Sequence, residues 1–164
     1  MTLKIPVSVL VVVHTRDLEV LLIERAARPG YWQSVTGSLE RPDEPLEAAA
    51  RRELHEETGL ESPPHALQRW NLTYAFEIYP EWRHRFAPGT THNVEHVFSL
   101  ELPGSVPVTL AAEEHTASQW LPWREAAERC FSWSNRDAIR MLPDRRRAAR
   151  RAQAPCASMR PPLR

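Results

Sequence analysis

Three carboxylates inside one predicted helix constrain this chain more than any other feature. Residues 45–58 are strong helix formers, and Gly59 after them is typical of a helix end. Glu53, Glu56 and Glu57 are spaced three and four residues apart, so they share one helix face and repel one another. Apolar residues at helical spacing occupy the opposite face, which gives the acidic face a fixed direction relative to a core.

Divalent cations would remove this repulsion. Mg²⁺ prefers oxygen ligands, usually a few carboxylates together with substrate phosphates and water. The sequence has no histidine and cysteine pattern typical of zinc. A solvated acidic face, partly neutralised by Arg51, Arg52 and His55, is the alternative. The carboxylates therefore favour an Mg²⁺ site, with Mn²⁺ as the other candidate metal, and a phosphorylated substrate.

The remaining elements indicate an α+β fold. Stretches rich in β-branched and aromatic residues predict strands at residues 5–14, 18–24, 31–37, 66–79, 92–102, 107–110 and 117–123. Further helices are predicted at 123–131 and 134–142, the second begun by Ser132 or Ser134, while Asp43 or Glu44 is expected to cap the first helix. Because strands and helices do not alternate regularly, we expect a mixed sheet with helices packed on its faces.

Charge is distributed unevenly along the 164 residues, a length that predicts one domain. Residues 143–164 hold seven arginines and one aspartate, a net charge of +6, so the rest of the chain carries −6. This segment has almost no large apolar residues, so we expect a domain at 1–142 and a basic, disordered tail at 143–164. A regulatory protein that binds nucleic acid through the tail is an alternative, but the tail lacks aromatic residues for base stacking.

Location is predicted from the cysteines and from hydropathy. Cys130 and Cys156 form neither a disulfide framework nor a metal motif. No apolar run reaches the ~18 residues that a membrane span needs. We expect a cytoplasmic protein without a membrane partner; the sequence does not predict an oligomeric state.

The region around the acidic helix resembles the signature of the Nudix hydrolases, which reads Gly, five residues, Glu, seven residues, Arg-Glu-aliphatic-x-Glu-Glu-x-Gly-aliphatic. This chain carries the signature at Gly37, Glu44, Arg52, Glu53, Leu54, Glu56, Glu57, Gly59 and Leu60. Six residues separate Gly37 from Glu44, one more than in the signature. The resemblance implies the Nudix fold, an α/β/α sandwich around a mixed sheet, and Mg²⁺-dependent hydrolysis of a nucleoside-diphosphate-type bond.

The same resemblance implies roles for individual carboxylates. Glu53 and Glu57 are expected to bind the metal directly, with Arg52 orienting the glutamates. Glu56 is expected to be a ligand or the partner of a ligand. Glu114, in a turn far along the chain, lies where the family offers a further ligand; a solvated turn carboxylate is the alternative. These four glutamates are the expected catalytic set, and the general base is Glu53, Glu56 or Glu114.

Segments outside the signature narrow the substrate. Residues 31–38, 76–96, 113–115 and 132–139 resemble the bacterial branch of the family that hydrolyses 7,8-dihydroneopterin triphosphate in folate biosynthesis. The expected reaction releases pyrophosphate and leaves the monophosphate. The alternative is a Nudix pyrophosphatase that converts nucleoside triphosphates to monophosphates. The expected partner is therefore a small pterin or nucleotide triphosphate.

The expected substrate-binding residues divide by chemistry. Arg25 and Lys4, the single lysine of the chain, suit phosphate oxygens, as does the helix N-terminus at Ser132, while the hydroxyl or a backbone group of Thr36 is expected to touch the substrate. A flat heteroaromatic ring needs a stacking surface and hydrogen-bonding groups along its edge. These are expected from Phe76, Glu77, Ile78 and Tyr79, with Glu114 completing the set; an ordinary strand, cap or loop role is the alternative for each.

Overall fold

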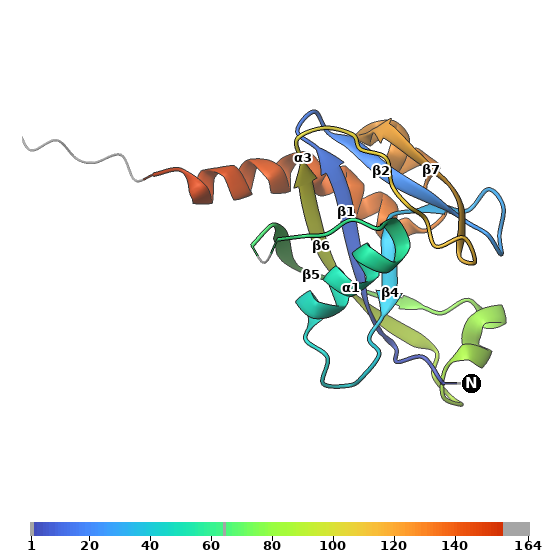
Figure 1. Cartoon of the computed structure of the whole chain (residues 1–164). Coiled ribbons are helices and arrows are strands. Elements are labelled where there is room, and N and C mark those ends of the chain that lie inside the picture. The colour runs from blue at the N-terminus through green and yellow to red at the C-terminus, as the bar shows by residue number, and fades with distance from the viewer. Residues whose placement is uncertain (1, 64, 156–164) are drawn as a thin grey trace, which may run out of the picture.

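The computed structural model describes residues 2–63 and 65–155, which form one seven-stranded mixed sheet between helices (Figure 1). The strands are β1 (Val7–Thr15), β2 (Glu19–Arg25), β3 (Trp32–Gln33), β4 (Val35–Ser38), β5 (Leu67–Glu77), β6 (His92–Leu102) and β7 (His115–Pro122). The helices are α1 (Leu46–Thr58), the 3-10 helix η1 (Pro80–Arg85), α2 (Trp123–Arg129) and α3 (Trp133–Gln153). Among the helices of these residues, none is long and apolar enough to cross a membrane.

Strand β1 is the centre of the sheet. The order is β3-β2-β1-β6-β5; β4 also pairs with β1, and β7 also pairs with β2. β1 runs parallel to β6 from Val7↔Val94 to Thr15↔Leu102, while the other pairs are antiparallel. A continuous run of buried valines and leucine in β1 reflects a strand that is covered on both faces.

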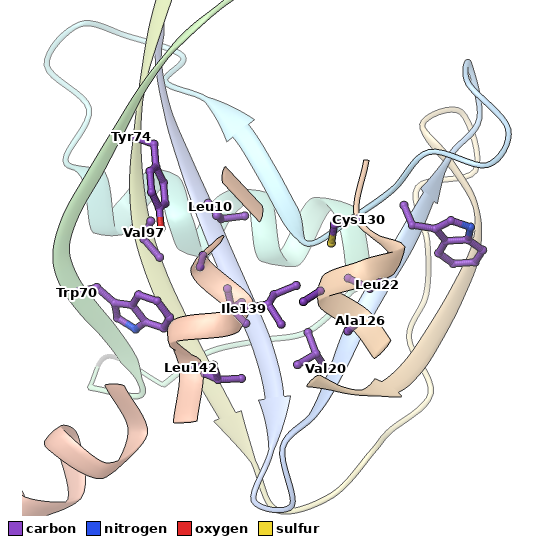
Figure 2. Close-up of a cluster of buried hydrophobic side chains, with 14 residues drawn as sticks. Leu10, Val20, Leu22, Trp70, Tyr74, Val97, Ala126, Cys130, Ile139 and Leu142 are labelled. Carbon is purple, nitrogen blue, oxygen red and sulfur yellow. The ribbon is translucent and has the colours of Figure 1, made fainter. Parts of the chain in front are cut away.

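Two apolar cores lie on opposite faces of the sheet. Leu10 and Val12 of β1 pack with residues of α2 and α3, including Ile139, in the cluster drawn in Figure 2. Val9 and Val11 point to the other face, where they pack with Ala49, Ala50 and Leu54 of α1. Helix α1 is thereby fixed against the sheet by its apolar face, as the sequence predicts, and its acidic face borders β4, where Glu57 is buried.

The start of α1 differs from the prediction. The N-cap is Pro45, whose oxygen accepts a hydrogen bond from the Ala49 amide, and no side chain caps the helix. Glu44 instead accepts a hydrogen bond from the Glu40 amide at 2.7 Å. Gly59 ends the helix with a φ of 70°, as predicted, because only glycine adopts this conformation at low cost.

Helix α3 is longer than predicted. Ser132 is the N-cap, as expected, but the helix continues through Pro143 to Gln153. Arg145 donates to the main-chain oxygen of Trp70 at 2.9 Å, and Arg146 donates to Glu101 at 2.9 Å. The helix predicted to end at 142 therefore continues into the segment expected to be a disordered tail, because contacts with β5 and β6 fix the first turns after Pro143. Residues 156–164 of the expected tail lie outside the described part of the chain.

The predicted strand at 107–110 is not formed. Pro107 lacks an amide donor for a sheet ladder. The segment crosses the end of α1 instead, where the Thr109 amide donates to the Thr58 oxygen at 2.9 Å. Val108 and Leu110 still pack against the apolar core on the α1 side.

Candidate active site

A cavity of about 1150 Å³ is lined by α1, the ends of several strands, η1 and the start of α3. Every residue that the sequence predicts to bind metal or substrate lies in its lining. These are Lys4, Arg25, Thr36, Glu53, Glu56, Glu57, Phe76, Glu77, Ile78, Tyr79, Glu114 and Ser132.

Arg52 ties the acidic face of α1 to the loop before it. Its guanidinium donates to Glu44 through Nε at 2.9 Å and through a terminal nitrogen at 3.2 Å. It also donates to Glu53 at 2.8 Å and to the main-chain oxygen of Ser38 at 3.1 Å. The hydrogen bonds to Glu44 raise the pKa of Arg52 above its usual value. The extra loop residue before Glu44 therefore does not keep this glutamate from its arginine.

Glu53 lies against β4 at the position of Gly37. A Cβ atom on Gly37 would lie 1.8 Å from Cδ of Glu53, so this approach requires a residue without a side chain. Burial raises the pKa of Glu53 to about 7, even though the hydrogen bond from Arg52 acts in the opposite direction. A cation in the cavity would stabilise the ionised carboxylate.

Glu57 is more deeply buried and is held by two elements. The Thr36 amide donates to Oε2 at 3.2 Å. Nε2 of His115 lies 3.1 Å from Oε1, so the two groups form an ion pair when the imidazole is protonated. Burial raises the pKa of Glu57, while the contact with His115 lowers it. The ligand atoms of Glu57, Glu114 and His115 all lie within 4.8 Å of one another, a spacing suited to a cation.

This compact group differs from the predicted metal ligands. Glu53 lies one helical turn before Glu57 but is not part of this group, which contains His115 instead. The side chain of Glu56 is 51% exposed and lies 3.4 Å from Arg52. The metal and catalytic roles of the glutamates stay predictions. His115 could not be selected from the sequence, because its burial follows from the pairing of β7 with β2.

Cationic side chains gather beside the carboxylates. Burial, followed by the charge of Arg85, lowers the pKa values of both Lys4 and Arg25. Arg25 donates to Gln33 at 3.1 Å and lies 5.0 Å above the ring of Trp82, while its Nε is buried without a hydrogen-bond partner. An anionic ligand would relieve the repulsion between these cations and accept a hydrogen bond from this free donor.

The hydroxyls of two predicted substrate contacts already make hydrogen bonds inside the protein. The Thr36 hydroxyl accepts a hydrogen bond from Gln33 at 3.2 Å. The Ser132 hydroxyl accepts from the amide of Asn135 at 3.4 Å and from its side chain at 2.9 Å. Their hydroxyls therefore position neighbouring side chains, and contact with a substrate stays a prediction for both.

The end of β5 supplies the predicted ring-binding residues. Ile78 is buried and lines the cavity, whereas Tyr79 is 45% exposed and meets Trp82 edge to face at 5.1 Å. The carboxylate of Glu77 is 67% exposed and is paired with Arg83. Glu77 is therefore already paired within the protein, and its contact with a substrate ring stays a prediction.

The sequence and the fold assign the chain to a known family. A family model for the NUDIX domain matches residues 4–142. The chain belongs to the Nudix hydrolase family. The predicted α+β Nudix fold is thereby confirmed, and the acidic helix α1 is the helix of the Nudix signature.

The similarity extends well beyond the signature. The Nudix domain is 42% identical over 139 residues to the dihydroneopterin triphosphate diphosphatase of Escherichia coli K12, covering 83% of this chain and 91% of that protein. It is 39% identical over 137 residues to the enzyme of the same name from Haemophilus influenzae, covering 81% and 84%. The solved structure of the E. coli dihydroneopterin triphosphate pyrophosphohydrolase matches with a TM-score of 0.81 and 40% identity, covering 87% and 97%.

The Nudix cavity also contains polar residues that the sequence did not single out. Glu95 in β6 is 4% exposed and accepts a hydrogen bond from the Ser134 hydroxyl at 2.9 Å. Nearby in the lining, Asn93 donates to Ser8 at 2.8 Å, and Asn135 accepts from the Ser34 amide at 2.8 Å. Asn93 and Glu95 point to the same face of β6, and the next residue on that face is apolar. Two polar residues at alternate positions on a buried strand face were the sequence signal that could have identified them.

Proposed function

We propose that this Nudix hydrolase cleaves 7,8-dihydroneopterin triphosphate to dihydroneopterin monophosphate and pyrophosphate, a step of folate biosynthesis. The 42% identity to the E. coli diphosphatase, continuous over 91% of that protein, carries the proposal. The cavity supports it, because it combines carboxylates, cations and aromatic side chains in one space. A cytoplasmic location and the absence of nucleic acid as a partner belong to the same proposal.

The carboxylates of the cavity fit Mg²⁺. Glu53 and Glu57 have raised pKa values because burial disfavours their charge, and a divalent cation would offset that cost. Glu53, Glu57 and Glu114 would hold the ion, with His115 next to Glu57. When bound, Mg²⁺ neutralises the triphosphate, activates a water molecule and stabilises the leaving oxygen. Mn²⁺ suits the same oxygen ligands.

The side chains of the protein perform the remaining tasks. Arg25 and Lys4 bind phosphate oxygens and place the triphosphate against the acidic face. Arg52 holds Glu53 in position through the contacts described above. A glutamate of the cavity accepts the proton of the attacking water, and Glu53, Glu56 and Glu114 are the candidates.

A pyrophosphate-release assay tests the proposal. Wild-type protein should turn over dihydroneopterin triphosphate faster than dATP at equal concentration in Mg²⁺. Glu53→Gln combined with Glu57→Gln should abolish release. Glu47→Gln is the matched control, since Glu47 lies on the same helix but is exposed and paired with Arg51. Much faster turnover of dATP would show that the substrate is an ordinary nucleotide.

A further inference from the structure

Glu95 is a buried carboxylate in the wall of the cavity. It lies in the middle of β6, opposite Ser8 of β1 and Tyr74 of β5. Its residue surface is only 4% exposed, yet it belongs to the cavity lining together with Ser134. The fold therefore places a charged group in the interior at a position open to a ligand.

The carboxylate has little compensation within the protein. Among the described residues, the Ser134 hydroxyl is its one side-chain donor, at 2.9 Å to Oε1, and Oε2 has none. Burial raises the pKa of Glu95 to about 7, and no neighbouring cation acts against this rise. Buried carboxylates are normally paired with a cation or with several donors, because desolvation is costly. An uncompensated carboxylate in a cavity is therefore more readily explained by a ligand that donates to it.

Among the described residues, no charged group of the cavity shifts the pKa of Glu95, which burial and the Ser134 hydrogen bond determine. The charges of Arg85, Glu53 and Glu114 act on the pKa of Lys4, so these groups form one charged end. None of them acts on Glu95. A substrate with one highly anionic end and one neutral end would place its neutral end beside Glu95.

Aromatic side chains border the same region. Phe76 is the cross-strand neighbour of Asn93, which lies two residues before Glu95. Trp133 precedes Ser134, is 52% exposed, and meets Tyr74 edge to face with ring centroids 5.3 Å apart. Phe76 and Trp133 both line the cavity and offer stacking surface for a flat ring.

We propose that Glu95 recognises the 2-aminopyrimidin-4-one edge of the substrate ring, accepting hydrogen bonds from its ring N–H and its exocyclic amino group. This inference rests on the proposed function for the identity of the natural substrate. A carboxylate presents two acceptors side by side, and this edge presents two donors side by side. Pterins and guanine share the edge, whereas adenine pairs its amino group with a ring acceptor. Glu95, rather than the exposed Glu77, is the acceptor for the ring.

The test compares three triphosphates with Glu95→Gln. The variant loses one acceptor and places an amide donor against the ring donors. kcat/KM for dihydroneopterin triphosphate and for dGTP should fall by about 100-fold, since a site built around hydrogen bonds discriminates strongly. kcat/KM for dATP should stay within about threefold. Equal losses on all three substrates, or no loss on any, would overturn the assignment.

A binding measurement separates this inference from the proposed function. Neopterin carries the ring without the triphosphate, so its fluorescence titration reports the ring site even if pterin triphosphate proves a poor substrate. Glu95→Gln should weaken neopterin binding at least about tenfold. Glu61→Gln, an exposed loop carboxylate outside the cavity, should not change it. If Glu95→Gln fails to fold, Ser134→Ala, which removes the hydroxyl that orients Glu95, should weaken neopterin binding; unchanged affinity would refute the inference.

Discussion

Replacing Gly37 with alanine should remove most hydrolysis while leaving the domain folded. A Cβ atom at this position would lie 1.8 Å from Cδ of Glu53 and 2.0 Å from its Oε1. Glu53 must therefore move by roughly 1.5 Å to restore a normal van der Waals separation. Metal ligands tolerate displacements of about 0.2 Å, and a misplacement of about 1 Å in a catalytic site costs on the order of 100-fold. We expect kcat to fall by at least about that factor.

The matched control is Gly104→Ala. An added Cβ meets no heavy atom within 4 Å at Gly104, and neither glycine has a positive φ, so both substitutions are free of backbone strain. Gly104→Ala should retain wild-type rates. Gly37 pairs with Val9 in the β1–β4 ladder, so overpacking there should cost about 1–3 kcal/mol of unfolding free energy. A thermal melt confirms that the variant is folded at the assay temperature.

A double-mutant cycle identifies the cause of the loss. If Gly37→Ala acts by displacing Glu53, then adding Glu53→Gln should cause little further loss of pyrophosphate release. Fully additive losses would place the effect elsewhere. A Gly37→Ala variant that keeps kcat within about threefold of wild type would refute the reasoning, because the position of Glu53 would then be unimportant.

Three further outcomes follow from the structure. Arg52→Lys should lower kcat by about 10- to 100-fold in the pyrophosphate assay, since lysine cannot donate to Glu44 with a planar fork. Burial raises the pKa of Glu95 to about 7, so the folded chain keeps a proton that the unfolded chain releases near pH 4.5. The free energy of unfolding should therefore decrease as the pH rises between these two values. In urea unfolding with EDTA, Glu95→Gln should reduce the loss of stability between pH 5 and 8 by up to about 3 kcal/mol, and an unchanged slope would contradict this. Truncation after Leu142 should lower the unfolding free energy by roughly 2 kcal/mol in the same assay, whereas truncation after Gln153 should leave it unchanged. Neither truncation should alter KM appreciably.

The parts of the fold that the sequence predicts well are those that local chemistry determines. The valine-rich run of β1 is continuous because both faces are covered, and that pattern is readable without neighbours. Gly59 marks the end of α1 because its backbone conformation favours glycine. Pro143 misled the prediction of α3, since a proline normally ends a helix. The contacts of Arg145 and Arg146 with Trp70 and Glu101 keep the chain helical, and these contacts exist only after β5 and β6 are in place.

The site divides in the same way. Glu53, Glu56 and Glu57 are predictable because helical spacing alone puts them on one face. Glu114 was selected through a family resemblance; it lines the cavity, and its role as a metal ligand stays a prediction. His115 and Glu95 escaped notice because their significance is burial, which depends on which strands become neighbours. A single histidine within a strand carries no local pattern that distinguishes an interior from a surface position, whereas for Glu95 the alternation with Asn93 was the one available signal.

In the proposed binding mode, the separation of charges would let one cavity recognise an anion at one end and a neutral ring at the other, with carboxylates at both ends. At the proposed charged end, Lys4, Arg25 and a divalent cation would offset the carboxylates, which alone would repel a triphosphate. At the other end, a cation beside Glu95 would pair with it and compete with the donors of a ring. An unpaired carboxylate there favours rings with two adjacent donors and penalises those that present an acceptor. Placing lysine or arginine next to Glu95, for example by Asn93→Lys, should therefore weaken the preference for dGTP over dATP even though Glu95 itself is retained.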